Sequence, residues 1–393
     1  MGESPSLRTS DFLPEEKQVS LGELALFFLR LGTTAFGGPA AHIAMMEDEL
    51  VRRRRWLSRE KFLDLLGASN LIPGPSSSEL AIHIGYLLCG WQGLVVAGIC
   101  FILPAAVMVA AIAWAYIRFG KLPAVAGVLY GIKPVVIAVI LQALWGLGRT
   151  AVKTTFLAIL GMVSIVLAFL NLHPLLLLLF GGAVACVASL KTRKQWGPAA
   201  LFRTIAIGSL TGTATAFSLV SLFLVFLKIG AIVFGSGYVL LAYLRADLVV
   251  SRGWLTDSQL VDAVAVGQVT PGPVFTTATF IGFILGGIRG ATISTVGIFL
   301  PAFLLVAMSG PLVPRIRKSK AAGAFLDGVN VASLALMAAV SWQLGRASVV
   351  DVVSVVLAFA SLIALLRFRL NSAWLVMAGA IVGSIANTFH VSR

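Results

Sequence analysis

Charged side chains are scarce in this chain: Asp, Glu, Lys and Arg make up 12% of its 393 residues, whereas hydrophobic residues make up 59%. A soluble protein of this length would need about twice that share of charge. The mean hydropathy is +0.97, and apolar runs of membrane-spanning length recur throughout. These features exclude an ordinary soluble domain and predict an all-α polytopic membrane protein whose main partner is the lipid bilayer.

Cysteine and histidine are equally sparse. The three cysteines lie singly in apolar segments, and the four histidines are widely scattered, so neither a disulfide framework nor a metal site is indicated. The chain also lacks a phosphate-binding loop of the Gly-x-x-x-x-Gly-Lys-Ser/Thr type, a nucleophile elbow and an HExxH element. We therefore expect no cofactor and no enzymatic activity, and any pumping should be secondary transport.

Acidic residues are fewer than basic ones, 16 against 30, which gives a formal net charge of +14. The basic residues gather between apolar segments, as expected of cytoplasmic loops that set topology, so we expect no nucleic-acid partner. Residues 1–20 lack the basic start and apolar core of a cleavable signal and are expected to form a retained tail. The four basic clusters lie at 52–61, 191–203, 315–320 and 367–369.

The chain contains an internal repeat. Residues 28–104 align with residues 226–301, first at an offset of 198 (234 − 36) and then, after a one-residue slip, at 197. This register pairs the two Pro-Gly-Pro motifs, at 73–75 and 271–273. We expect a tail (1–20), a first transporter repeat (21–190), a basic linker (191–212) and a second repeat (213–393), because membrane proteins often build sites at the seam of such halves.

The short apolar segment at 76–92 follows a helix-breaking Pro-Gly-Pro and is at the lower length limit for a span. If it belongs to a re-entrant hairpin, each half makes five crossings, the second half is inverted, and all four basic clusters face the cytoplasm. We therefore expect inverted 5+5 transmembrane repeats. Residues 47–70 are expected to form an amphipathic interfacial helix.

Broken helices within a bilayer survive only where protein or a water-filled cavity satisfies the freed polar groups. A helix that restarts after Pro-Gly-Pro offers free N–H groups and a positive dipole end to an anion. A second break is expected at Phe36-Gly37-Gly38-Pro39 and at its equivalent, Phe234-Gly235-Ser236-Gly237, although tight helix packing is an equal alternative there.

Cations within apolar segments are candidate anion ligands. Arg30 and Lys228 occupy equivalent places before the two glycine breaks. Arg149 and Arg346 are also paired, each in a Leu-Gly-Arg sequence at the end of an apolar run, where snorkelling to the membrane surface is the stronger interpretation. The candidate substrate-binding residues are Arg30, Phe36, Gly37, Gly38, Pro39, Pro73, Gly74, Pro75, Ser76, Ser77, Lys228, Gly235, Ser236, Gly237, Pro271, Gly272, Pro273 and Thr276.

Proton coupling would require carboxylates or imidazoles at membrane depth. Glu79 is the strongest candidate because it follows the first Pro-Gly-Pro, and His42 is the second. Closing a helix capping box is the alternative role of Glu79.

The motifs Phe36-Gly37-Gly38-Pro39, Arg55-Trp56-Leu57 and Ile72-Pro73-Gly74-Pro75, with their second-copy equivalents, resemble those of the chromate ion transporter family in its long, two-domain form. The resemblance covers residues 21–390. It implies proton-driven efflux of chromate across the bacterial inner membrane, with sulfate as a similar dianion, and it leaves a homodimer possible. The alternatives are an importer or exchanger of sulfate or another oxyanion, and a passive anion channel. Ser236 departs from the third glycine expected in the second copy.

Overall fold

The structure is a computed structural model that describes residues 19–36, 38–120, 122–170, 172–191, 217–234, 239–309, 319–368, 370 and 372–391. Within these ranges all regular secondary structure is helical, as the composition predicts. Four helical stretches are long and apolar enough to cross a bilayer, and shorter apolar helices accompany them. These four are Ser76–Phe119, Gly127–Ala151, Val274–Ser309 and Ala321–Ser348.

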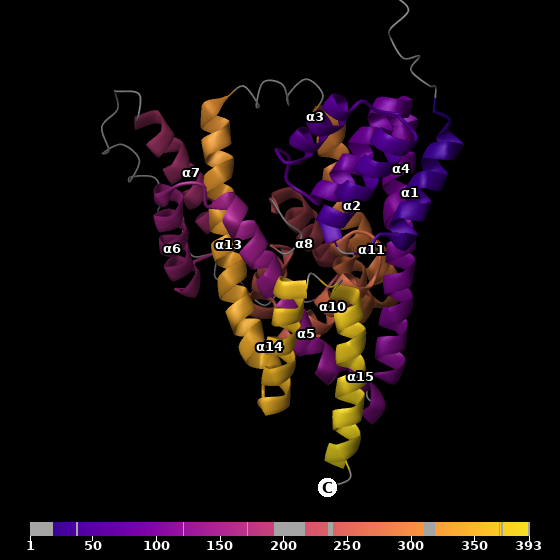
Figure 1. Ribbon diagram of the computed structural model, residues 1–393, viewed down its shortest axis with the longest axis vertical. Helices are drawn as coiled ribbons and strands as arrows, with labels where there is room; N and C mark the ends of the chain where they lie inside the picture. The colour runs from indigo at the N-terminus through magenta and orange to yellow at the C-terminus, as the bar shows by residue number, and fades with distance from the viewer. Residues whose placement is uncertain are drawn as a thin grey trace, which may run out of the picture.

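The two halves have matching elements (Figure 1). The first half contains α1 (Leu21–Thr34), α2 (Gly38–Met46), the π-helix η2 (Glu47–Arg53), α3 (Arg59–Ser69), α4 (Ser76–Phe119), α5 (Pro123–Ala151), α6 (Thr155–Phe169) and α7 (Pro174–Lys191). The second contains α8 (Leu219–Ile232), α9 (Leu240–Leu244), the π-helix η3 (Arg245–Ser251), α10 (Asp257–Val269), the 3₁₀-helix η4 (Val274–Thr276), α11 (Thr277–Ser309), α13 (Lys320–Ser348), α14 (Val352–Phe368) and α15 (Ser372–Val391).

The repeat extends to local detail. After each π-helix a tryptophan donates its backbone N–H to a leucine carbonyl, Trp56 to Leu50 and Trp254 to Leu248, both at 2.8 Å. An arginine then stacks on each indole ring, with its guanidinium carbon 4.9 Å from the centroid in the first copy and 5.4 Å in the second. Two homologous halves of one fold are therefore present.

Residues 47–70 differ from the single amphipathic helix that we expected. They form η2 and α3, separated by a turn in which Arg55 adopts a positive φ of 54°. The side chain of Ser58 then accepts a hydrogen bond from the N–H of Lys61 and caps α3. The expectation failed because a capping serine in the middle of the segment starts a new helix.

Helix α4 is a hairpin. Its chain reverses at Cys89 and at Gly90, which has a φ of 59° that glycine adopts without strain. The backbone of Gly85 then lies against that of Gly93. Helix α11 repeats this turn at Gly286 and Gly287, with nearly the same angles.

The first arm of α4 extends from Ser76 to the turn. Its roughly 13 residues give a length of about 20 Å. A bilayer core is about 30 Å thick, so this arm cannot cross it alone. This reversal lies near the end of residues 76–92, the segment whose short length suggested a re-entrant hairpin.

The longer second arms of α4 and α11 pack antiparallel across the interface between the halves. Gly98 of α4 lies against the ring of Phe303, and Leu94, one turn earlier, clusters with Val306. The residue numbers thus rise along α11 as they fall along α4, which is the pattern of antiparallel helices.

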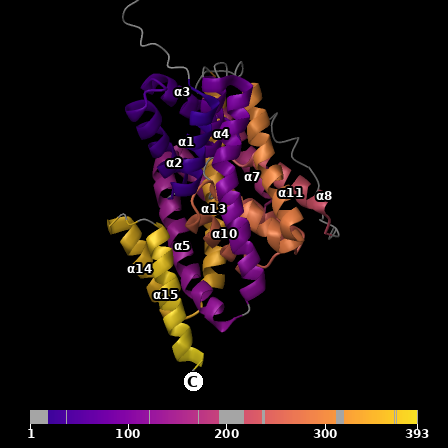
Figure 2. The ribbon, with the colours of Figure 1, turned by 90° about the vertical axis from the view of Figure 1, so that its right-hand side faces the viewer.

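The long helices α5 and α13 are exchanged between the halves. Helix α5 packs against α14 and α15 of the second half, and α13 packs against α6 and α7 of the first. Figures 1 and 2 both show α5 beside the yellow α15. Glycines allow this close approach, since Gly131 touches Gly379 and Gly328 touches Gly181.

The α4 hairpin gives a stability test. A methyl group at Gly85 would collide with the carbonyl oxygen of Gly93, so Gly85→Ala should destabilise the protein by about 1–3 kcal/mol through overpacking. Thermal unfolding in detergent should show a lower midpoint. Gly323→Ala is the matched control, because no atom lies within 4 Å of the added methyl group. Equal midpoints for the two variants would contradict the hairpin packing.

Candidate functional site

The helix breaks of the two halves meet through reciprocal hydrogen bonds. The N–H of Gly74, in the first Pro-Gly-Pro, donates to the carbonyl of Val233 at 2.7 Å. The N–H of Gly272, in the second, donates to the carbonyl of Ala35 at 3.0 Å. Ala35 and Val233 are equivalent residues that directly precede the two Phe-Gly breaks. The predicted breaks therefore lie together, and each satisfies a polar group of the other half.

His42 reinforces the first break. Its Nε2 lies 3.1 Å from the Ala35 carbonyl, which can only accept, so Nε2 carries the proton. Its Nδ1 lies 3.3 Å from the hydroxyl of Ser77 at the start of α4. Both side chains are buried. His42 thus links α2, the chain break and the restarted helix.

Glu79 lies directly beneath the first Pro-Gly-Pro turn. Its side chain is fully buried, and neither carboxylate oxygen has a hydrogen-bond partner among the described residues. A side chain at Gly74 would collide with Oε1 of Glu79, so the carboxylate touches this turn. The alternative role as a helix cap is wrong, because Pro75 is the N-cap residue and receives no side-chain cap.

His83 lies one turn further along α4 and joins the two halves. Its Nδ1 is 3.0 Å from the carbonyl of Glu79, and its Nε2 is 2.9 Å from the hydroxyl of Ser309 at the end of α11. The exposed fraction of His83 is 7%. The first arm of α4 therefore carries two ionisable groups in the protein interior.

The second Pro-Gly-Pro is built differently. Residues 271–280 are all buried, and the hydroxyl of Thr276 donates to the carbonyl of Pro273 at 2.8 Å. The positions equivalent to His42, Ser77 and Glu79 hold Leu240, Phe275 and Thr277. The second Pro-Gly-Pro is consequently buried, and no ionisable group occupies these three positions.

A cavity of about 900 Å³ opens beside the first break. Its charged lining residues are Arg149, Lys153 and Asp327, and Lys153 donates to Asp327 at 2.7 Å. Pro39 and Ser76 are the two predicted substrate-binding residues that line it. Further lining residues include Asn70, Gln142, Trp145, Thr150, Phe234, Asn330 and Ser333. Polar groups lie among a largely apolar lining, and the charged residues give it a formal charge of +1, which favours an anion.

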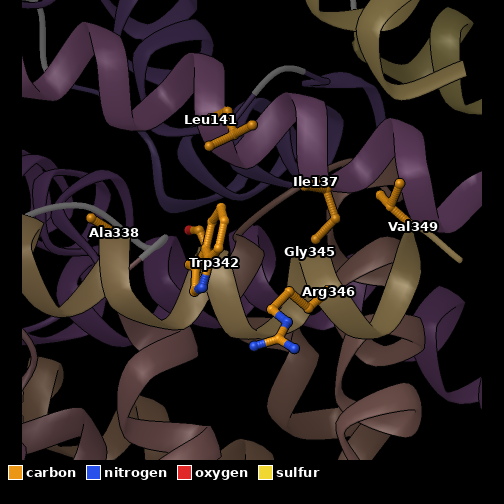
Figure 3. Close-up of a pocket in the computed structure, with 8 residues that line it drawn as sticks. Ile137, Leu141, Ala338, Trp342, Gly345, Arg346 and Val349 are labelled. Carbon is orange, nitrogen blue, oxygen red and sulfur yellow. The ribbon is translucent and has the colours of Figure 1, made fainter. Parts of the chain in front are cut away.

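A smaller cavity, of about 410 Å³, lies between α5 and α13. Figure 3 shows Trp342 and Arg346 one turn apart on α13, with Ile137 and Leu141 on the neighbouring α5. None of the residues that line it belongs to a helix break.

The remaining predicted residues lie as follows. Arg30 is exposed on α1, and Phe36 is 40% exposed. The amine of Lys228 donates to Asp247 at 2.6 Å, and Asp247 also accepts from Arg252. Neither predicted cation lines a cavity described above. Gly38, Gly74 and Pro75 are buried and Pro73 is partly so, whereas Gly37 and Gly235-Ser236-Gly237 lie outside the described residues.

The predicted tail and basic linker, apart from Val19, Ser20 and Lys191, also fall outside the described residues. No group of three potential metal ligands occurs in the described part of the chain.

The cavity lining contains residues that the sequence analysis did not propose as substrate contacts, above all Arg149, Lys153 and Asn330. For Arg149 a signal was present in the sequence, but snorkelling was the favoured interpretation. The pattern Trp-x-Leu-Gly-Arg occurs at 145–149 and again at 342–346, at equivalent places in the two halves. Lys153 and Asn330 carry no such signal, because they enter the cavity only through the packing of α5 against α13.

Comparison with known proteins agrees with this architecture. A family model described as chromate transporter matches the chain twice, over residues 22–187 and 220–384. The chain is 33% identical over 374 residues to a chromate transport protein of Cupriavidus metallidurans, covering 93% of each chain. It is 32% identical to a probable chromate transport protein of Synechococcus elongatus, covering 93% of this chain and 95% of that one.

A third relative is a chromate transport protein of Pseudomonas aeruginosa, with 30% identity over 93% of this chain and 92% of that one. No solved structure matches. The two family matches coincide with the two structural halves. The chain therefore belongs to the chromate transporter family, in its two-domain form, and is a multi-pass membrane transporter.

Proposed function

We propose that this protein exports chromate across the bacterial inner membrane by proton-coupled alternating access. One observation carries the proposal: the first Pro-Gly-Pro break adjoins both an electropositive cavity and a fully buried carboxyl group. Such a site can take up an anion on one face and a proton on the other. The relatives whose names include chromate transport support the choice of substrate.

The anion would enter from the cavity and meet the start of α4. There Ser76 lines the cavity, and the N–H groups of the first turn of α4 form the positive end of a helix dipole. Chromate is a tetrahedral dianion, and such donors suit its oxygens. The other predicted substrate-binding residues of the two breaks would shape the path, because the two Pro-Gly-Pro motifs hold each other in place.

The proton would be carried by Glu79. A carboxyl group enclosed in protein without hydrogen-bond partners is stable only in its neutral form, whereas contact with water would release the proton. His42 lies beside the same turn and would transmit the change in charge of Glu79 to Ala35. The Ala35 carbonyl also accepts a hydrogen bond from Gly272 of the other half. Proton release and movement between the halves would thus be linked.

The halves would be inverted 5+5 repeats. The antiparallel second arms of α4 and α11 support this, since equivalent helices of parallel repeats would point the same way. Rocking of one set of hairpins against the other would then expose the site alternately to the two sides.

Reconstitution tests the substrate and the coupling. Purified protein in proteoliposomes should accumulate chromate when a pH gradient is imposed, and a protonophore should abolish the accumulation. Sulfate and molybdate competition would measure selectivity, because the dianions share charge and shape. Sulfate as the preferred substrate would favour an importer or exchanger. Unitary currents in planar bilayers, without saturable flux, would instead establish a channel.

Replacement of Glu79 tests the proton site. Glu79→Gln keeps the volume but cannot ionise, so flux driven by a pH gradient should fall at least about tenfold, the cost of losing one coupled protonation step. Chromate counterflow, which needs no net proton movement, should persist. Glu60→Gln, on the exposed face of α3, is the matched control and should behave as wild type. A Glu79→Gln variant with normal pH dependence would exclude Glu79 from coupling.

A further inference from the structure

The Trp-x-Leu-Gly-Arg pattern places one arginine at the edge of each of the two cavities. Trp145 and Arg149, on α5, line the larger cavity, and Trp342 and Arg346, on α13, line the smaller one (Figure 3). Leu334 in the larger cavity is likewise equivalent to Ile137 in the smaller. The two cavities therefore share three equivalent positions on α5 and α13.

The two cavities lie at different levels along an antiparallel helix pair. Lys153, just beyond the end of α5, binds Asp327 near the start of α13, and Asp351, just beyond the end of α13, binds Tyr130 near the start of α5. Arg346 lies at the level of Ile137, because its neighbour Gly345 touches that residue. About twelve residues separate Ile137 from Arg149 on α5, so the two arginines lie about 18 Å apart along the helix axis.

The larger cavity adjoins the first helix break, whereas no residue of a helix break lines the smaller cavity. On the side of the smaller cavity α10 packs against α5, α13 and α15, where Lys133 of α5 binds Ser258 at 2.6 Å and Asp262 at 3.3 Å. Its first-half counterpart, α3, makes no comparable packing with α13 in the described structure. The residue equivalent to Lys133 is Asn330, which lines the larger cavity instead.

Arg149, in the larger cavity, has no acidic partner among the described residues. The acidic residue of that cavity, Asp327, is bound to Lys153. Arg346 likewise forms no ion pair with a described residue, and both arginines are exposed. A guanidinium group presents a planar fork of donors that matches the oxygens of a dianion. The recurrence of an arginine and a tryptophan beside a cavity at equivalent places in both halves favours a shared role over snorkelling.

We infer that Arg149 and Arg346 are the anion-attracting residues of two alternating access routes, one for each side of the membrane. The inference deepens the proposed transport function and rests on it. Arg149 binds the oxyanion in the state described here, with the first break open. Arg346 does so in the opposite state, in which α10 leaves α5 and α3 moves toward α13.

Sided transport measurements test this inference. Chromate flux is measured in right-side-out and inside-out membrane vesicles, with chromate added outside. Arg149→Gln should raise the half-saturating chromate concentration about tenfold in one vesicle orientation, because one charge-assisted contact is lost. In the other orientation the rise should be less than about twofold. Arg346→Gln should show the reverse pattern. Arg149→Lys should recover part of the affinity, because it restores the charge but not the fork.

Arg289→Gln is the matched control, because Arg289 is an exposed cation on α11 that lines neither cavity. It should match wild type in both orientations, and equal membrane levels of all variants establish that they fold. Variants that impair flux from the same side, or that leave both sides unchanged, would overturn the inference. Absence of chromate flux in wild-type vesicles would instead refute the proposed function itself.

Discussion

The architecture depends on two crossed hydrogen bonds at the centre of the molecule, from Gly74 to Val233 and from Gly272 to Ala35. A break in a membrane helix frees polar backbone groups that lipid cannot satisfy, and each half here supplies the missing partner for the other. Each half therefore contributes to holding the broken helix of the other. The interface between the halves is therefore also the place where backbone polarity is available at depth, and any movement there must exchange these bonds rather than simply lose them.

The two halves share their helical framework but differ in the side chains around their helix breaks. The hairpins, π-helices and arginine–tryptophan stacks recur almost unchanged, whereas His42, Ser77 and Glu79 of the first break are replaced by Leu240, Phe275 and Thr277 in the second. The buried histidine and carboxyl side chains at these positions are thus found at the first break and not at the second. The unequal packing of α3 and α10 gives the same asymmetry on a larger scale, since α10 packs against α5, α13 and α15, whereas α3 makes no comparable contact with α13 in the described structure.

Sequence patterns predicted much of this structure. Apolar runs located the long helices, and the repeated prolines and glycines located the breaks, because both signals are local. The turn at Gly90 was less visible, since a single glycine in an apolar run has several uses. The exchange of α5 and α13 between halves, and the cavity that contains Asn330, depend on contacts between residues far apart in sequence, which periodicity does not encode. The pairing of Lys228 with Asp247 was hidden for the same reason.

The exchange of α5 and α13 also bears on how the chain is made. Helix α5 is synthesised long before α14 and α15, against which it packs, so its glycine-lined face lacks these partners until the two helices leave the ribosome. During that interval the membrane insertion machinery or lipid must occupy the groove around Gly131. The packing of α5 is consequently completed only after α14 and α15 have been made.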